Sequence, residues 1–336
     1  MKSARLVLLV AAAAWALPSC NRTSPALGTA TSIIVLATDS VWSAIGDSVM
    51  TALEPRIYTV RSERTFEVTQ ISPTDPDWQE LREFRQVVAI GAADDAWVQP
   101  IFDRAGLQPG VSQPEVVTTR DVWARNQQAI AIAVPSADDG AAALPHLERV
   151  GAVIDSMFRI YVVQRMYTSG PDTALSRALR DTHGFALLLP NVYAPLERTG
   201  NVLLFQNNTT VGGDLARSVL VGWQDGTVTP TAEAALAWRD SISAQQYNPP
   251  QSTRRDSISA SAVSMESGEG IEIQGAWEGT DPAWPMGGLF ITRMVTCPQQ
   301  NRTYLLDTWL YAPGPRRSKY EYMIQLQTIM STFECA

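Results

Sequence analysis

The chain is poor in the residues that build metal centres, with two histidines and three cysteines among 336 residues. A multi-histidine metal site or a cysteine cluster cannot be assembled from so few ligands. Basic residues are also outnumbered, because 26 Lys and Arg face 34 Asp and Glu and leave a net charge of −8. A surface of that sign repels phosphate backbones, so nucleic-acid binding is disfavoured. The hydrophobic content of 45% instead favours a globular protein, and the length suggests about two domains.

Long hydrophobic runs are absent after residue 20, where no stretch reaches 18 consecutive apolar residues. No later segment is therefore expected to span a membrane. The N-terminus is different. Lys2 and Arg5 precede an apolar run at 6–17, which has the length of a signal-peptide core and is too short to cross a bilayer.

The residues that follow, Leu17-Pro18-Ser19-Cys20, resemble the lipobox of bacterial lipoproteins. The resemblance implies that residues 1–19 are a lipoprotein signal peptide and that Cys20 carries fatty acyl chains such as palmitate. The protein would then face the periplasm of the bacterial cell envelope, anchored to a membrane through Cys20. An ordinary secretory signal with an incidental cysteine is the alternative. Residues 20–31 are polar, with Pro and Gly, and are expected to form a flexible tether without structure of its own.

The body divides into two halves, 32–170 and 171–336, at a Ser-Gly-Pro break near residue 170. In the first half, helical spacing predicts helices that begin at Asp39 and Asp75 and a long one over 138–167. Short β-branched or alternating runs predict strands there, at 32–37, within 57–71, and at 86–92, 116–123 and 128–134.

The second half begins with a short helix at 173–182 and has a longer one at 231–246. Its predicted strands lie at 185–189, 201–206, 218–223, 271–277, 289–295 and 303–311, and the last three are expected to form an antiparallel meander. Residues 249–261 indicate a loop or an edge strand. Ser318 and Glu321 form a capping box before the final helix.

Because strands and helices alternate without a regular βαβ rhythm, the predicted fold class is α+β, with two α/β halves, mostly antiparallel sheets and a long C-terminal helix. The second half resembles the Mog1/PsbP type of α/β sandwich in its topology.

Segments at 275–278 (GAWE), 286–290 (MGGLF) and 306–313 (LDTWLYAP) resemble the DUF4837 family of bacterial lipoproteins. Further matches lie at 325–329 (QLQTI) and 121–124 (DVWA). The resemblance extends over most of the mature chain. It implies an anchored envelope protein of unknown function and supplies no catalytic residues.

Motifs of catalysis and cofactor binding are missing: the sequence has no GxGxxG after a strand, no GxxxxGK[ST], no HExxH, no CxxC and no GxSxG. A Ser–His–acid triad would have to use His146 or His183, which we interpret as surface or capping residues. The acidic pairs at 94–95 and 138–139 can serve as hard-cation ligands or, more commonly, as turn and cap residues. No cofactor or metal is predicted.

Aromatic residues gather around a glycine pair near the end of the chain. Trp277, Trp284 and Trp309 can line a groove for a sugar or peptide, or belong to the core. Gly287 and Gly288 can form a cradle of backbone N–H groups or a tight turn with positive φ, and we favour the turn.

A basic knot of Arg316, Arg317 and Lys319 stands out on an acidic protein. It can capture an anionic group of a partner or simply face water. Once Cys20 is acylated, Cys297 and Cys335 remain as one even pair, either bridged or free.

These features favour a non-catalytic lipoprotein that binds or scaffolds an unidentified envelope protein or ligand. The alternatives are a small-ligand or glycan-binding module with a Trp-rich groove and, less favoured, a hydrolase.

Overall fold

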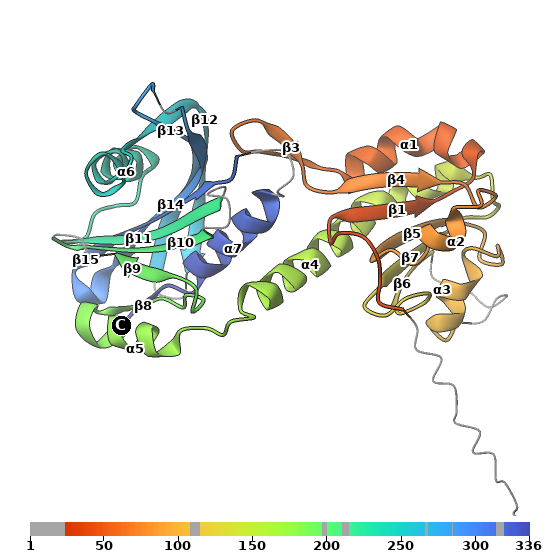
Figure 1. The fold of residues 1–336 in the computed structure, drawn as a ribbon, viewed down its shortest axis with the longest axis horizontal. Helices are drawn as coiled ribbons and strands as arrows, with labels where there is room; N and C mark the ends of the chain where they lie inside the picture. Colours follow the sequence, from red (N-terminus) through yellow and green to blue (C-terminus); the bar gives the residue numbers. More distant parts are fainter. Residues whose placement is uncertain are drawn as a thin grey trace, which may run out of the picture.

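A computed structural model shows two domains connected by the long helix α4, Leu147–Met166 (Figure 1). The structure describes residues 24–107, 115–196, 200–209, 215–265, 268–283, 285–313 and 319–336. The predicted signal peptide and Cys20 lie outside these ranges. Within them, no helix combines the length and the apolar character needed to cross a membrane.

The first domain contains a five-stranded sheet in the order β4 (Glu67–Ile71), β1 (Ser32–Leu36), β5 (Gln86–Gly91), β7 (Gln128–Ala133) and β6 (Val116–Arg120). The first four strands are parallel and β6 runs antiparallel to β7. One face packs on α4 and α1 (Asp39–Leu53). The other packs on α2 (Trp78–Leu81) and α3 (Gln99–Arg104).

The expectation of mostly antiparallel sheets is therefore wrong for the first half. Strands β1, β5 and β7 are almost wholly buried, as parallel strands covered by helices on both faces are. The βαβ rhythm is hidden in the sequence by a small hairpin of β2 (Arg56–Tyr58) and β3 (Ser62–Arg64), which separates α1 from β4.

The segment before β1 also belongs to this domain. Pro25 forms a parallel bridge with Arg125, and Leu27 forms another with Phe84. The backbone N–H of Leu27 donates to the carbonyl of Glu83 at 2.9 Å. The prediction that all of 20–31 contributes nothing to the fold is thus wrong for residues 24–31.

The second domain is built on a seven-stranded antiparallel sheet. Its order is β12 (Gln251–Met265), β13 (Gly268–Gly279), β14 (Gly287–Cys297), β15 (Arg302–Tyr311), β11 (Leu215–Asp225), β10 (Val202–Thr209) and β9 (Ala194–Leu196). The meander predicted near the end of the chain is confirmed as β13, β14 and β15. The stretch left open as loop or edge strand is the edge strand β12.

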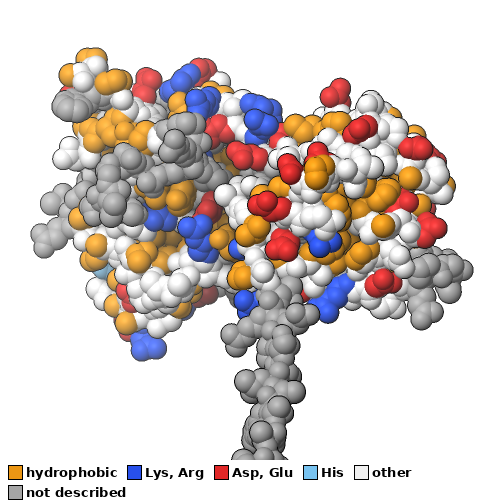
Figure 2. All heavy atoms as spheres, turned by 45° about the vertical axis from the view of Figure 1, so that its right-hand side comes forward, with side chains coloured by type: hydrophobic (Ala, Val, Ile, Leu, Met, Phe, Trp, Pro, Cys, Tyr) orange, Lys and Arg blue, Asp and Glu red, His pale blue; other side chains and the backbone are white. Residues whose placement is uncertain are grey.

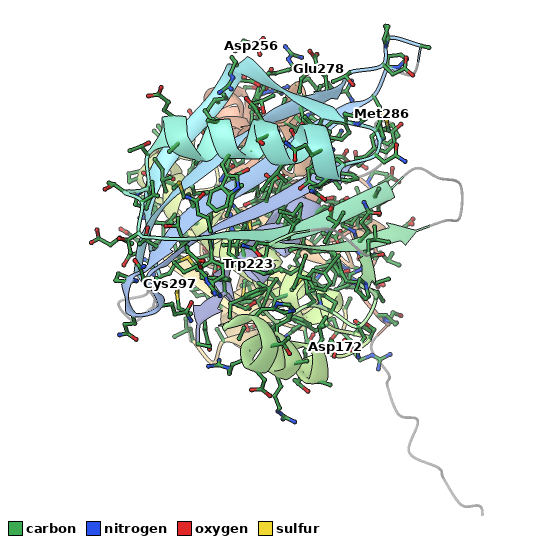
Figure 3. The ribbon with its side chains drawn as sticks, turned by 90° about the vertical axis from the view of Figure 1, so that its left-hand side faces the viewer. Asp172, Trp223, Asp256, Glu278, Met286 and Cys297 are labelled. Atoms are coloured by element: carbon green, nitrogen blue, oxygen red, sulfur yellow. A yellow bond between two sulfur atoms is a disulfide. The ribbon has the colours of Figure 1, made fainter. Side chains whose placement is uncertain are left out.

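Helix α6 (Ala232–Gln246) lies across one face of this sheet (Figure 3). The opposite face packs on α5 (Thr173–His183) and α7 (Lys319–Ser331). The remaining elements are short: the helical turns Gly140–His146 and Pro298–Gln300, and the strand pair β8 (Phe185–Ala186) and β16 (Glu334–Cys335).

Helix α7 belongs to both cores and so joins the domains. Its Tyr320 and Ile324 pack in the apolar cluster of the first domain, whereas Leu326 and Ile329 pack in the second. The Nη2 of Arg159, on α4, donates to the Tyr320 hydroxyl at 2.8 Å. Packing on both cores holds α7 against α4, so that the N-terminal half of α7 lies at the junction between the domains.

Candidate functional site

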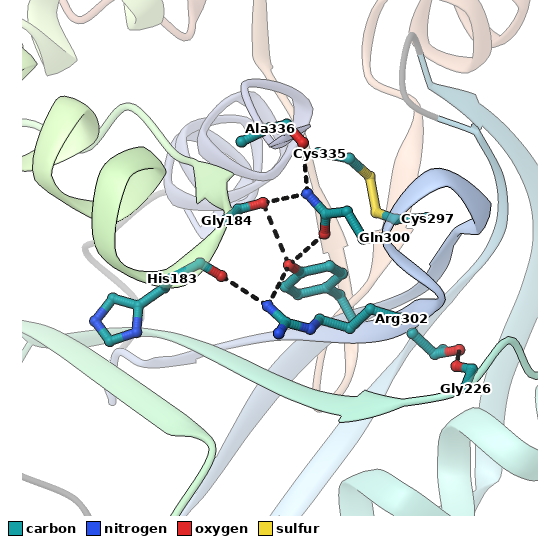
Figure 4. Close-up of a disulfide and its surroundings, with 10 residues drawn as sticks. His183, Gly184, Gly226, Cys297, Gln300, Arg302, Cys335 and Ala336 are labelled. Atoms are coloured by element: carbon teal, nitrogen blue, oxygen red, sulfur yellow. Dashed lines mark hydrogen bonds between the residues drawn. A yellow bond between two sulfur atoms is a disulfide. The ribbon is translucent and has the colours of Figure 1, made fainter.

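The two C-terminal cysteines form a disulfide, with their Cα atoms 6.1 Å apart (Figure 4). The Nε2 of Gln300 donates to the carbonyls of Gly184 at 2.6 Å and Ala336 at 2.7 Å. These bonds and the Cys297–Cys335 bridge hold the end of the chain against β14 and α5. Their role is to secure the fold.

The candidate aromatic groove is not open to solvent where it can be followed. Trp277 is 1% exposed and Trp309 is 7% exposed, and their rings pack edge to face at 5.5 Å beneath α6. Trp284 lies outside the described residues. The two described indoles are core residues that support the sheet below α6.

The favoured turn at the glycine pair is wrong. Gly287 and Gly288 lie in the strand β14, and neither has a positive φ. A Cβ on Gly288 would lie 1.8 Å from the carbonyl oxygen of Leu310 and 2.8 Å from the indole nitrogen of Trp277. Glycine is needed there because two strands approach too closely for any side chain.

Arg316, Arg317 and the capping residue Ser318 also lie outside the described residues. Lys319, the third member of the basic knot, is paired at 2.5 Å with Glu63 of the β2–β3 hairpin. This ion pair connects α7 with the hairpin of the first domain. Figure 2 shows acidic side chains spread over one face of the first domain and basic ones nearer to the junction with the second.

The two histidines and the acidic pairs occupy structural positions. His146 Nε2 lies 3.2 Å from the carboxylate of Glu115, and the ring of His183 packs against that of Trp223 at 5.3 Å. Asp95 accepts a 2.7 Å hydrogen bond from the backbone N–H of Ala92. Burial and the charges of Asp94 and Asp138 raise the pKa of the Asp95 carboxyl against that bond. No group of three or more metal-ligating side chains occurs in the described ranges.

A cavity of about 550 Å³ opens where α4 ends against α7 and the second sheet. We call it the junction cavity. Its charged lining residues are Arg165, Arg217 and Glu321, and its polar lining includes Tyr193, Asn207 and Gln325. Arg165 comes from the last turn of α4, Arg217 from β11, and Glu321 and Gln325 from one face of α7.

A chain of polar contacts holds these groups in place. The Nη1 of Arg165 lies 3.0 Å from Glu321 Oε1. Gln325 donates to the same oxygen at 3.3 Å and accepts from Arg217 Nη1 at 2.5 Å. Arg217 also lies over the ring of Tyr322 at 5.1 Å. Two guanidinium groups and one carboxylate leave one positive charge among these residues, so the cavity favours anions.

Two residues that line the junction cavity each hold a buried hydrogen-bond donor without an acceptor. The hydroxyl of Tyr193, a residue only 5% exposed, and the Nε of Arg217 are both buried without a partner. Burial raises the pKa of Tyr193 to about 12, against the lowering effect of Arg217, so the phenol keeps its proton and remains a donor. A buried donor without an acceptor costs about 1–3 kcal/mol, which a ligand oxygen would recover.

The sequence does not reveal this cavity: Glu321 belongs to the predicted capping box and Gln325 to the family segment 325–329, and neither motif points to a pocket. Gln325 is the residue whose sequence context could have indicated a buried polar site. It is a polar residue on a helix face whose neighbours Ile324 and Leu326 are buried, and such a residue requires a partner.

The fold and the cavity together define a two-domain α/β protein with an anion-favouring pocket at its junction. Residues 172–332 match DUF4837, a domain of unknown function, and the second domain belongs to this family. Residues 26–159 match a different domain of unknown function, DUF8532. The family resemblance is confirmed for the second half. Its predicted extent over most of the chain is wrong, because 121–124 falls within the DUF8532 match.

Similarity to solved structures is weak. The Ran-binding protein Mog1p of Saccharomyces cerevisiae shares 12% identity with a TM-score of 0.30, over 45% of this chain and 90% of that chain. A crystal structure from Bacteroides thetaiotaomicron shares 12% identity with a TM-score of 0.27, over 46% of this chain and 45% of that chain. No curated protein matches the chain. The Mog1/PsbP-like topology stays a prediction.

Proposed function

We propose that the protein is a membrane-anchored lipoprotein of the bacterial cell envelope that binds a small anionic ligand in its junction cavity. The observation that carries the binding role is the pair of unpartnered donors, Tyr193 Oη and Arg217 Nε, in a cavity of about 550 Å³. The lipobox-like sequence before Cys20 supports the anchor.

The lining favours a ligand that accepts hydrogen bonds through negatively charged oxygens. Both open groups are donors, and the lining charges add up to a positive site. A carboxylate or sulfate oxygen between Tyr193 and Arg217 would form charge-assisted bonds, which are stronger than neutral ones. The groups already paired, Arg165 with Glu321 and Gln325 with Arg217, keep the cavity ordered before the ligand arrives.

The binding role is tested by titrating the full-length protein, in detergent, with sulfate, succinate and glucuronate in a calorimeter. At least one of these probes should bind saturably. Tyr193→Phe removes only the unpartnered hydroxyl and should weaken that binding roughly tenfold, the loss of one charge-assisted hydrogen bond. Tyr58→Phe, at an exposed phenol on the β2–β3 hairpin, is the matched control and should bind as the wild type does.

The binding role is contradicted if no probe saturates the wild type, or if Tyr193→Phe binds with unchanged affinity. The anchor is tested separately in cells. The wild type should fractionate with membranes and incorporate a palmitate analogue, and Cys20→Ser should do neither. Equal labelling of the two proteins would refute lipidation at Cys20.

A further inference from the structure

A second cavity, of about 390 Å³, lies in the first domain against α4. We call it the glutamine cavity, because Gln86 and Gln128 form its floor at the starts of β5 and β7. These two residues are direct neighbours in the parallel register, so their side chains leave the same face of the sheet. It shares no lining residue with the junction cavity.

Each of the two glutamines leaves one polar atom without a partner. Gln86 is 5% exposed and donates through Nε2 to the carbonyl of Ala30 at 2.6 Å, while its Oε1 is buried and unbonded. Gln128 is 7% exposed, and its Nε2 is buried and unbonded. The two residues that form the cavity floor therefore hold one buried acceptor and one buried donor without partners.

The adjacent residue, Gln127, is a glutamine whose side chain has a purely structural role. Gln127 donates through Nε2 to the carbonyls of Arg82 at 2.5 Å and Phe84 at 2.7 Å, and its Oε1 accepts from the backbone N–H of Trp123 at 3.0 Å. Every part of that amide is used to brace a loop. The open atoms of the two neighbouring glutamines have no such use.

The charged wall residues are Arg85, Arg120 and Asp121, which together leave one positive charge. Arg85 lies over the ring of Tyr161 at 5.4 Å, and Arg120 donates from Nη2 to the sulfur of Met157 at 3.7 Å. Within the described ranges neither guanidinium takes part in an ion pair. Both remain available to a carboxylate.

We propose that the glutamine cavity binds a small molecule that carries a primary carboxamide and a carboxylate, as free glutamine or asparagine does. A primary carboxamide presents one N–H and one C=O on the same edge. That edge matches the acceptor of Gln86 and the donor of Gln128, and the carboxylate pairs with a wall arginine. The trans amide of a peptide backbone does not offer both groups on one edge.

The test is a calorimetric titration of the full-length protein with L-glutamine and, separately, with L-glutamate, which has nearly the same shape but no amide donor. Glutamine should bind saturably and at least tenfold more tightly than glutamate. Gln128→Leu removes an atom that has no partner in the free protein, and it should weaken glutamine binding at least tenfold. Gln79→Leu, at an exposed position of α2, is the control and should leave binding unchanged.

Tyr193→Phe separates this site from the junction cavity, because it should leave glutamine binding intact. The proposal is overturned if glutamine does not saturate the wild type, if glutamate binds equally well, or if Gln128→Leu retains wild-type affinity. Loss of glutamine binding in Tyr193→Phe would likewise overturn it and place the amide in the other cavity.

Discussion

The two domains differ in the side chains that are buried between the central sheet and the helices that cover it. In the first, apolar clusters cover both faces of the parallel sheet, and buried polar side chains such as Gln86 and Gln127 lie at or just before the starts of its strands. In the second, an ion pair with no exposed area lies between α6 and the sheet, with Arg239 Nε 3.1 Å from Asp307 Oδ1. The Tyr247 hydroxyl donates to Asp307 Oδ2 at 2.6 Å, and the guanidinium lies 3.8 Å above the ring of Phe290. The first core depends on shape and area, whereas the second also depends on the completeness of a polar network.

The largest expected effect on the free energy of unfolding comes from a substitution at Gly288, where β14 and β15 approach closely. Gly288→Ala should destabilise the second domain by about 5 kcal/mol or more, because the new Cβ would lie 1.8 Å from the Leu310 carbonyl and must push β14 from β15. Gly226→Ala is the control, since Gly226 has a φ of 96° but open space around it, and it should cost about 1 kcal/mol. Urea unfolding measures both. Equal stability of the two variants would contradict the close approach.

Breaking the buried ion pair comes next. Asp307→Asn should lower the free energy of unfolding by roughly 4 kcal/mol, because it leaves the Arg239 charge buried without a counter-ion. Asp256→Asn breaks a solvent-screened pair with Arg254 and should leave the free energy of unfolding nearly unchanged. If the two changes had similar effects on chemical denaturation, the distinction between the two cores would be unfounded.

The disulfide supports only the second domain and has a smaller expected effect. Removing the bridge by Cys335→Ala opens a loop of 38 residues and should lower stability by about 3 kcal/mol. Hydrogen exchange should accelerate in β14 and β16 and remain unchanged in β1 and β5. Uniform acceleration in both sheets would show that the domains unfold as one unit.

The smallest expected effect is a pH dependence in the junction cavity. Burial raises the pKa of Glu321 above its ordinary value of 4.5, against the lowering effects of Arg165 and Arg217. As pH falls through that raised pKa, Glu321 gains a proton and the cavity becomes more positive. Sulfate, which stays charged, should then bind roughly fivefold more tightly. Glu321→Gln should bind sulfate with little pH dependence, and a wild type that binds more weakly at acid pH would contradict the assignment.

The raised pKa of Glu321 also makes the free energy of unfolding depend on pH. The folded state holds this proton more tightly than the unfolded chain, so the contribution is fully present below the unfolded pKa. It is lost as pH rises through the folded pKa. The wild type should therefore be relatively more stable than Glu321→Gln at the acid end of this window, as measured by denaturant unfolding at matched pH.

Predictions from sequence succeeded where a local pattern alone decides the structure. The apolar periods located the meander of β13, β14 and β15 and the helix α7. They failed for the direction of the strands in the first sheet, because parallel pairing joins β1 to β5 across more than fifty residues, a relation that no local window contains.

The cavities depend on the same long-range relations. Tyr193 and Arg217 come from separate segments and meet only once β11 and α7 have packed. Gln86 and Gln128 become neighbours through the parallel register of β5 and β7. The glycine pair was noticed in the sequence, but its reason was wrong, because a strand that passes within contact of Gly288 leaves no local signal.

The most direct test of ligand binding at the junction is the tyrosine spectrum of the full-length protein labelled with ¹³C at its tyrosine rings. During a sulfate titration the resonance of Tyr193, assigned by its absence in Tyr193→Phe, should shift saturably, while that of the exposed Tyr58 should stay in place. A saturable shift confined to tyrosines outside the junction cavity, or a Tyr193 resonance unmoved at saturating sulfate, would contradict the account.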